Sequence, residues 1–220
     1  MGGLPAGSAT SGIVLFGIGS PICVDIIETC RRNGQPITAG IKNFDGPIYV
    51  GDDVDVVDAA IVTPTLSALP FLLPLFDPRN RRAAREAATT LGFREPARLV
   101  DRTAIMAGDC VVEAGVYVNA GCIVASAATL EEFAFCNRGA NIGHHCKIGA
   151  FASIGPGAIL AGLVEMGEAS QVGAGAVILP KVRIGAGALV APGAVVARDV
   201  PDRGFAAGNP ARIQASPPTG

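Results

Sequence analysis

The chain has 220 residues, of which 50% are hydrophobic and 29 are glycine, and its 17 basic and 19 acidic side chains give a net charge of −2. No basic stripe indicates binding to nucleic acid or to an anionic membrane surface, and no apolar run is long enough to span a bilayer. Six cysteines without a cationic leader sequence predict reduced thiols and a cytoplasmic protein.

The first part of the chain predicts strands that alternate with helices. Short apolar runs bounded by turn residues predict strands at 12–17, 37–41 and 59–63. An amphipathic helix is expected at 21–32, with Asn33-Gly34 as its C-terminal stop. This alternation predicts a small parallel, Rossmann-like α/β domain.

A second helix is expected after the third strand. Asp77-Pro78 provides an N-cap and a first-turn proline for a helix that reaches about Leu91. The apolar stretch ahead of it, residues 66–76, contains two prolines and is interpreted as a buried or interface loop.

A glycine-containing turn follows the first expected strand and precedes the first helix. A phosphate binds at this place when a helix N-terminus faces it, but Ile22 replaces the third glycine of the dinucleotide motif. No acidic residue ends the second strand either, so a nicotinamide cofactor is not expected. A nucleotide or sugar phosphate, and a turn without any ligand, both stay open as interpretations. The candidate substrate-binding residues are Gly17, Gly19, Ser20, Lys42 and Asn43.

From Leu99 to Val200 the chain divides into seventeen consecutive six-residue units without an insertion. The second residue of each unit is Val, Ile, Leu, Met or Cys, and the sixth is Ala, Cys, Ser or Val. A period of six fits neither a helix nor a simple strand, and it predicts coils of three short strands joined by tight corners. Four of the six cysteines occupy the second or sixth place, which predicts small core residues rather than nucleophiles.

These hexads, together with the stretch NRGANIGHHCKIGAFASIGPGAILAG at 137–162, resemble the hexapeptide-repeat acyltransferases. The resemblance is to the nucleotide-amino-sugar acetyltransferases and sialic-acid O-acetyltransferases, whose small α/β domain precedes a left-handed parallel β-helix. It covers nearly the whole chain and implies a homotrimeric, acetyl-CoA-dependent enzyme of bacterial glycan biosynthesis. The expected divisions are a flexible tail at 1–11, a substrate-binding α/β domain at 12–96, a β-helix acyltransferase domain at 97–202 and a C-terminal segment and tail at 203–220.

The family motif is matched by Asn137, His144, Cys146, Ile148 and Gly149. The resemblance implies that His144 is the general base, which removes a proton from the acceptor amine or hydroxyl before that group attacks the acetyl thioester. The backbone N–H of Gly162 is then expected to donate to the oxyanion. Asn137 belongs to the expected catalytic group.

Two positions depart from the family pattern. His145 stands where the family has an acidic residue, and Ser153 stands where some members have a second histidine near the acetyl group. Because a neutral imidazole does not stabilise an imidazolium as a carboxylate does, we expect slower catalysis or an orienting group from elsewhere. His145 acting as the base itself is a further alternative.

Coenzyme A, in the relatives, lies in the groove between neighbouring β-helices beside the last coils. The residues expected to contact it are Ser153, Gly162, Gly173, Pro180, Gly185 and Arg212. The glycines and the proline also fit as corner residues without a ligand, and Arg212 as an ordinary surface residue.

The expected substrate is a nucleotide-linked amino sugar, with O-acetylation of a sugar as the second choice. A scaffold or binding protein with weakened catalysis is the rival interpretation, because of the substitutions at His145 and Ser153. A metal-dependent hydratase is disfavoured, because carbonic anhydrases of this fold bind zinc through three histidines and the chain has two. No metal is therefore expected.

Overall fold

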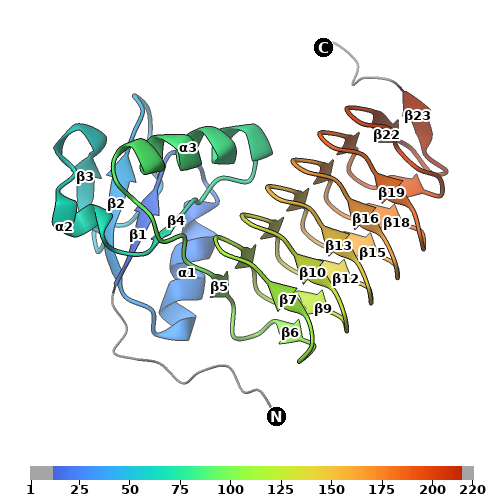
Figure 1. Cartoon of the computed structure of the whole chain (residues 1–220), viewed down its shortest axis with the longest axis horizontal. Helices are drawn as coiled ribbons and strands as arrows, with labels where there is room; N and C mark the ends of the chain where they lie inside the picture. The colour runs from blue at the N-terminus through green and yellow to red at the C-terminus, as the bar shows by residue number, and fades with distance from the viewer. Residues whose placement is uncertain (1–11, 215–220) are drawn as a thin grey trace.

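Parallel strands build both parts of the chain in the computed structural model, which describes residues 12–214. An α/β domain packs beside the first coils of a long prism of stacked short strands, and the C-terminal strands close the far end of the prism (Figure 1). The expected tail at 1–11 and the last residues of the expected C-terminal tail lie outside the described residues.

The α/β domain contains one parallel sheet, sheet A, with the strand order β3-β2-β1-β4. Its strands are β1 Ile13–Phe16, β2 Ile37–Lys42, β3 Val56–Asp58 and β4 Phe71–Leu72. The predicted first and second strands are confirmed, and the strand predicted at 59–63 is wrong. Ala59–Ile61 forms a short 3-10 helix instead, because the Asp58 carboxylate accepts a hydrogen bond from Ala60 N–H at 2.8 Å and caps the turn.

The stretch 66–76 was expected to be a loop, and it contains the short strand β4. Phe71 and Leu72 pair with Val14 and Leu15 of β1, and the β4 side chains are buried as expected. A short helix, α2 Pro64–Ser67, begins where Thr63 caps its first turn.

Both predicted longer helices are confirmed. The first is α1 Cys23–Asn33, and Gly34 ends it in the left-handed conformation with φ 66°. The second is α3 Pro78–Thr90, whose N-cap Asp77 accepts hydrogen bonds from the first-turn N–H groups.

The seventeen hexads form a left-handed β-helix, as the family resemblance implied, in which each hexad supplies one strand of two residues. Sheet B contains β5 Leu99–Val100, β8 Tyr117–Val118, β11 Phe135–Cys136, β14 Ser153–Ile154, β17 Gln171–Val172, β20 Leu189–Val190, β22 Phe205–Ala207 and β23 Arg212–Gln214. Sheet C contains β6 Ile105–Met106, β9 Ile123–Val124, β12 Asn141–Ile142, β15 Ile159–Leu160, β18 Val177–Ile178 and β21 Val195–Val196. Sheet D contains β7 Val111–Val112, β10 Thr129–Leu130, β13 Lys147–Ile148, β16 Glu165–Met166 and β19 Arg183–Ile184.

From β5 to β18, each strand pairs in parallel with the strand eighteen residues further on, as when Asn141 of β12 pairs with Ile159 of β15. The prism therefore has three corners, which we name B–C, C–D and D–B after the sheets they join. The second-place residues from Val118 onward all point inward and are buried, as the hexad pattern predicted. Cys122 and Cys146 are buried in this core, and burial raises the pKa of the Cys122 thiol to about 11.

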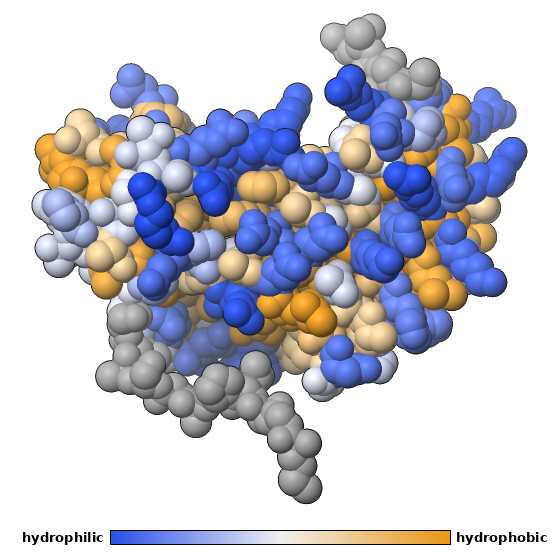
Figure 2. Space-filling model, in the orientation of Figure 1, coloured by the Kyte–Doolittle hydropathy of each residue, from blue (hydrophilic) through white to orange (hydrophobic). Residues whose placement is uncertain are grey.

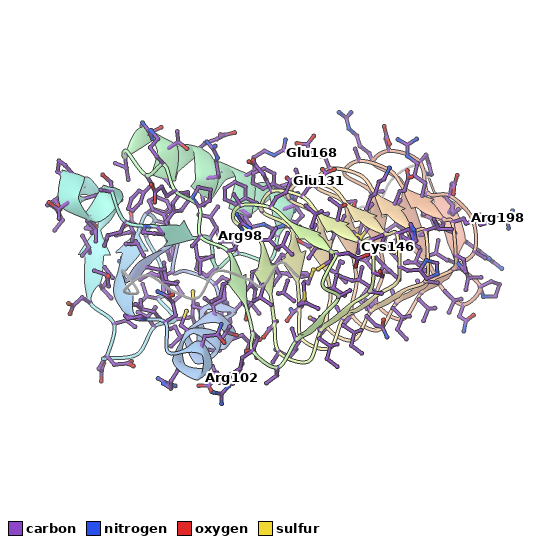
Figure 3. The ribbon with its side chains drawn as sticks, turned by 60° about the horizontal axis from the view of Figure 1, so that its bottom comes forward. Arg98, Arg102, Glu131, Cys146, Glu168 and Arg198 are labelled. Atoms are coloured by element: carbon purple, nitrogen blue, oxygen red, sulfur yellow. The ribbon has the colours of Figure 1, made fainter. Side chains whose placement is uncertain are left out.

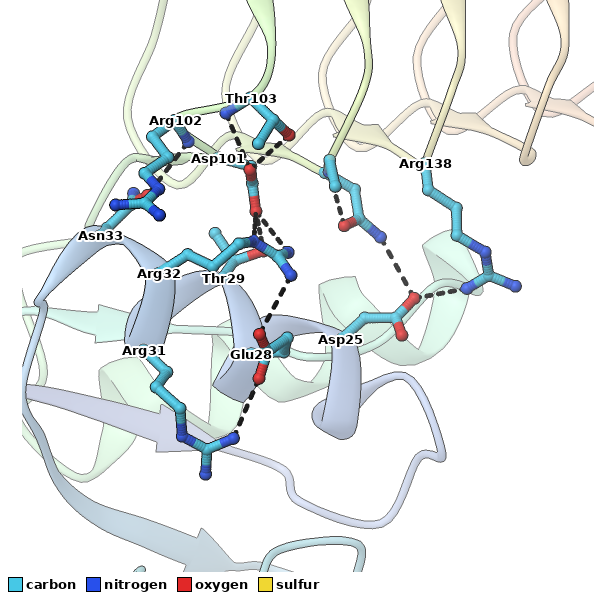
Figure 4. A network of polar contacts seen from close by, with 12 residues as sticks. Asp25, Glu28, Thr29, Arg31, Arg32, Asn33, Asp101, Arg102, Thr103 and Arg138 are labelled. Atoms are coloured by element: carbon cyan, nitrogen blue, oxygen red, sulfur yellow. Dashed lines mark hydrogen bonds and ion pairs between the residues drawn. The ribbon is translucent and has the colours of Figure 1, made fainter.

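The α/β domain covers sheet B and the two corners beside it. Tyr117 and Phe135, on the outer side of sheet B, share one apolar cluster with Ile26 and Cys30 of α1. Around this cluster, Asp101 accepts hydrogen bonds from the Arg32 guanidinium and the Thr29 hydroxyl (Figure 4). Sheets C and D carry no such cover among the described residues. Within residues 12–214 we find no helix with the length and apolar character needed to cross a membrane.

Candidate active site

His144 and His145 lie at the C–D corner, between β12 and β13, and both side chains are exposed. Their Nδ1 atoms are 3.1 Å apart, which is a hydrogen-bond distance, and their rings stand nearly perpendicular at 87°. The two imidazoles therefore form a pair that faces outward from the prism.

Gly162 lies one coil beyond His144 at the same corner. The N–H of Leu163 donates to the carbonyl of His144 at 2.9 Å, so the two coils are fixed against each other here. A Cβ atom on Gly162 would lie 2.5 Å from Nε2 of His144, so only glycine leaves space for the imidazole. Among residues 12–214 no backbone carbonyl accepts a hydrogen bond from the Gly162 N–H, which leaves this donor available.

At the C–D corner, residues with side chains occupy positions whose left-handed backbone conformation favours glycine. At the fifth hexad place of this corner, Ala127, His145, Leu163 and Lys181 have φ values between 57° and 65°. A non-glycine residue in this region costs roughly 1–2 kcal/mol. The same places at the B–C corner hold glycine from Gly121 to Gly193.

At the D–B corner, non-glycine residues with positive φ pack against the α/β domain of the same chain. Phe133 and Phe151 have the same left-handed backbone, and their stacked rings pack against the α/β domain. At the C–D corner Leu163 is 41% exposed and Lys181 is exposed, with no covering element among the described residues. We therefore interpret the C–D corner as a surface that binds a ligand or another subunit.

An acidic group lies below the histidine pair. The Ser126 hydroxyl donates to Oδ2 of Asp109 at 2.7 Å, and the N–H of His145 donates to the Ser126 carbonyl at 3.0 Å. The Ser126 hydroxyl and the Ala127 N–H lower the pKa of the Asp109 carboxyl, and His145 contributes electrostatically. Sequence reasoning missed Asp109, although it stands thirty-six residues, or two coils, before His145.

Asn137 lies at a different corner from His144. It follows β11 at the B–C corner, is 6% exposed, and accepts hydrogen bonds from Asn119 Nδ2 at 3.1 Å and from Arg138 N–H at 2.8 Å. Asn119 and Arg138 both donate to Asp25 of α1 (Figure 4). Within one chain, the structure therefore places Asn137 beside the α/β domain and not beside the histidines.

Ser153 is fully buried on sheet B and has its partners inside the chain. Its hydroxyl donates to the Phe76 carbonyl at 2.7 Å and accepts from the Arg81 guanidinium at 2.9 Å. It stands on the face that the α/β domain covers, so its side chain is not open to coenzyme A in this structure.

The other expected coenzyme contacts lie on several corners. Pro180 is exposed in the same column as His144 and Gly162. A Cβ on Gly173 would lie 2.5 Å from the backbone of Pro192, and one on Gly185 would overlap Asp202, so stacking alone requires these glycines. Arg212 is exposed on β23, at the end of the prism. Figure 3 shows Cys146 inside the prism and Arg198, also at the C–D corner, on the outside.

The expected substrate residues of the α/β domain meet at the carboxyl ends of β1 and β2. Gly17 has φ 87°, and a Cβ there would lie 3.6 Å from Oδ1 of Asn43. Ser20 belongs to the same turn, and Lys42 ends β2. The half-buried ring of Phe44 occupies the space that a Cβ on Gly19 would need. Sequence reasoning missed Phe44, because its contact with the turn arises only from the fold.

The described residues contain no group of three or more His, Cys, Asp or Glu side chains that could hold a metal ion. The corner combines the imidazole pair of His144 and His145 with the Gly162 N–H, which no backbone carbonyl accepts among residues 12–214. An unprotonated imidazole accepts a proton, and a free N–H beside it stabilises a developing oxyanion. Acyl transfer requires both of these functions.

Comparison with known proteins supports this chemistry. A family model described as bacterial transferase hexapeptide (six repeats) matches residues 164–198. Comparison with curated protein sequences gives no significant match.

Three solved structures share the whole architecture. PerB from Caulobacter crescentus in complex with CoA and GDP-perosamine is 32% identical over 95% of this chain and 100% of its own, with a TM-score of 0.84. A variant of perosamine N-acetyltransferase from the same organism is 31% identical over 95% and 99%, with a TM-score of 0.85. The acetyltransferase domain of PglB from Neisseria gonorrhoeae, in complex with acetyl coenzyme A, is 26% identical over 91% and 98%, with a TM-score of 0.80. The chain belongs to the hexapeptide-repeat family of sugar acetyltransferases and is an acyltransferase.

Proposed function

We propose that the protein transfers the acetyl group of acetyl-CoA to the amino group of a nucleotide-linked sugar, in bacterial glycan biosynthesis. The main support for this proposal is that His144 lies directly against Gly162, whose N–H has no backbone acceptor among the described residues. Acetylation of a sugar hydroxyl is the second candidate, because the same pair of groups would serve it.

The roles follow from the two groups. Nε2 of His144 takes a proton from the acceptor amine as the amine nitrogen attacks the thioester carbon. The Gly162 N–H donates to the oxygen that becomes negative, and one such donor is worth about 3–4 kcal/mol of barrier. The C–S bond then breaks, and the proton returns from His144 to the coenzyme A sulfur.

The relatives support both ligands. PerB was crystallised with CoA and GDP-perosamine, and the PglB domain with acetyl coenzyme A. At the amino-terminal turn the Gly17 N–H donates to the Ile41 carbonyl, whereas among residues 12–214 no backbone carbonyl accepts from the Gly19 N–H, which a nucleotide-linked sugar would contact together with the Asn43 amide. Acetyl-CoA would lie along the C–D corner, past Gly162 and Pro180 toward the last coils and Arg212.

The position of the α/β domain favours a site shared between subunits. In one chain, that domain and Asn137 lie beside the B–C corner, whereas His144 lies at the C–D corner, with sheet C between them. A neighbouring copy that packs against sheet C would bring the C–D corner of one subunit to the B–C corner of the next. Gly173, at the B–C corner, would then border the same groove as Pro180 of the neighbouring copy.

Sheet C has the surface that such a neighbour needs. Its outward side chains include Ile105, Ile123 and Ile159, which are 65%, 39% and 44% exposed. Figure 2 shows apolar residues along this side of the β-helix, between hydrophilic ones. The family resemblance implies a homotrimer, and a closed trimer with sheet C at its interfaces is the assembly that we propose.

The test is an assay with acetyl-CoA and a panel of nucleotide-linked amino sugars, in which mass spectrometry detects acetylated product. His144→Ala is the test variant, and Lys147→Ala, an exposed residue of neighbouring sheet D, is the control. Product that depends on His144 and not on Lys147 supports the proposal and identifies the acceptor. Acetyl-CoA binding without product from any sugar would mean that the acceptor class is wrong, and no acetyl-CoA binding at all would favour a binding or scaffold protein.

A further inference from the structure

His145 presents its imidazole on the outer side of the C–D corner. Its φ is 58°, in the left-handed region where histidine is enriched together with asparagine and aspartate, and its side chain is exposed rather than packed. Among residues 12–214, its side chain makes one hydrogen bond, which joins its Nδ1 to Nδ1 of His144 at 3.1 Å. That hydrogen bond orients the exposed His145 ring toward the proposed base.

A hydrogen bond between two Nδ1 atoms needs one donor and one acceptor. If neutral His145 donated, neutral His144 would carry its own proton on Nε2, and Nε2 would accept no other. If His144 donates, its Nε2 keeps a free lone pair beside Gly162, where a Cβ atom would be 2.5 Å away. The hydrogen bond at one ring nitrogen thus decides what the other can do.

We propose that His145 is a positioning residue, whose Nδ1 accepts the Nδ1–H of His144 and holds the tautomer with a bare Nε2 beside Gly162. This inference rests on the proposed function. In the family that this chain resembles, an acidic residue stands at the position of His145. The inference assigns the role of that acidic residue to the His145 imidazole.

Asp109 completes the arrangement two coils away. Its carboxylate is held by the Ser126 hydroxyl at 2.7 Å, and it interacts electrostatically with His145. When Nε2 of His144 takes the proton of the acceptor amine, the His145 lone pair stabilises the positive charge on His144, and the Asp109 carboxylate acts electrostatically on His145. The proton leaves again to the coenzyme A sulfur, so the pair ends the cycle unchanged.

Nuclear magnetic resonance tests the tautomer directly, because the untagged chain contains only these two histidines. In protein labelled with ¹⁵N-histidine, the long-range ¹H–¹⁵N spectrum distinguishes Nδ1–H from Nε2–H, and His145→Asn assigns the signals. We expect Nδ1–H for His144 and Nε2–H for His145 at a pH where both rings are neutral. An Nε2–H tautomer for His144 in the unmodified protein would overturn the proposal.

Kinetics test the consequence. His145→Asn keeps an acceptor oxygen and tolerates the left-handed backbone, whereas His145→Ala removes the acceptor. We expect His145→Ala to lower kcat roughly 10- to 100-fold with the acetyl-CoA KM unchanged, and His145→Asn to recover most of the loss. Ala169→Gly, which has the same backbone conformation at the D–B corner with φ 54°, is the control for relief of strain.

The outcomes separate this inference from the proposed function. If His144→Ala abolishes turnover while His145→Ala leaves kcat unchanged, His145 does not position the base and only this inference fails. If His144→Ala retains turnover and His145→Ala abolishes it, the roles are reversed and His144 fails as the base. Equal losses in His145→Ala and His145→Asn that follow a lower melting temperature would make the role of His145 merely structural.

Discussion

The imidazole of His144 lies against the Cα of Gly162, so that a methyl group there would approach Nε2 to 2.5 Å and Cε1 to 2.6 Å. Gly162→Ala is therefore expected to push the ring away from its working position. Because a misplacement of about 1 Å can cost 10²-fold in rate, kcat should fall roughly 100-fold. Steady-state kinetics measure it, with Gly108→Ala as the control, because a Cβ at that equivalent corner position meets nothing within 4 Å.

Arg81 should contribute strongly to stability. It is 1% exposed, and its guanidinium donates to the Ser153 hydroxyl and to the carbonyls of Leu75, Phe76, Phe133, Phe151 and Ala152. Burial lowers the pKa of Arg81, but its oxygen partners hydrogen-bond the charged form.

Arg81→Met would leave the carbonyls of Leu75, Phe133 and Phe151 without their hydrogen-bond donor, and we expect a loss of about 3–5 kcal/mol in urea unfolding. Arg82→Met removes the half-exposed ion pair with Glu168 and should cost less than about 1 kcal/mol. Equal effects in the two variants would contradict the role assigned to Arg81.

Asp101 makes the junction between the domains sensitive to acid. Burial alone would raise its pKa, but hydrogen bonds from Arg32, Thr103 and Thr29 lower it to about 2. A depressed folded-state pKa means that the stabilisation, about 2 kcal/mol, is complete above pH 4 and is lost as the pH falls toward 2.

Asp101→Asn should therefore lower the stability at neutral pH and flatten the dependence between pH 4 and pH 2. Urea unfolding at a series of pH values measures both effects. Asp53→Asn, which removes an exposed partner of Arg31, should leave the slope unchanged.

The apolar stripe on sheet C should be an interface between subunits. Ile159→Glu places a charge at its middle, and we expect a smaller species in analytical ultracentrifugation together with loss of turnover. Lys147→Glu on the charged face of sheet D should change neither. A trimer that survives Ile159→Glu would exclude this face as the contact.

Phe44 should contribute to acceptor binding rather than to coenzyme binding. Its ring fills the space above Gly19, at the turn proposed to meet the nucleotide. Phe44→Ala should raise the KM of the nucleotide-linked acceptor several-fold, since one aromatic stacking contact is worth about 1–3 kcal/mol. The KM of acetyl-CoA should stay the same, and a rise in both would indicate a general loss of structure.

The repeat predicted the β-helix, its inward residues and the corner position of the histidines, because hydrophobic burial alone sets the six-residue period. A spacing of eighteen residues also explains why His144 and Gly162 meet, since one coil separates them. The α/β domain was harder to predict. The edge strand β3 is half-exposed and only three residues long, so its sequence lacks the apolar run that marks a buried strand.

The hexad repeat does not predict which of the three sheets the α/β domain covers. Ser153 and Asn137 depend on the packing of the α/β domain against sheet B, and no local pattern in the hexads predicts that contact. The same holds for Arg81, whose six acceptors come from three separate segments of the chain. Phe44 was missed because its contact with Gly19 arises from the fold of the α/β domain itself, whereas the eighteen-residue spacing could have identified Asp109, which lies two coils before His145.

Because the hexads follow one another without an insertion, the position of a strand in the sequence determines the sheet to which it belongs. Removing eighteen residues after the site, such as 165–182, would delete one whole coil and move the following corners closer to His144 by about 4.8 Å, with every face preserved. Removing six residues would instead rotate each later strand onto the next face, so that the apolar stripe of sheet C would be interrupted. Shortening of this protein is therefore tolerated only in steps of eighteen residues.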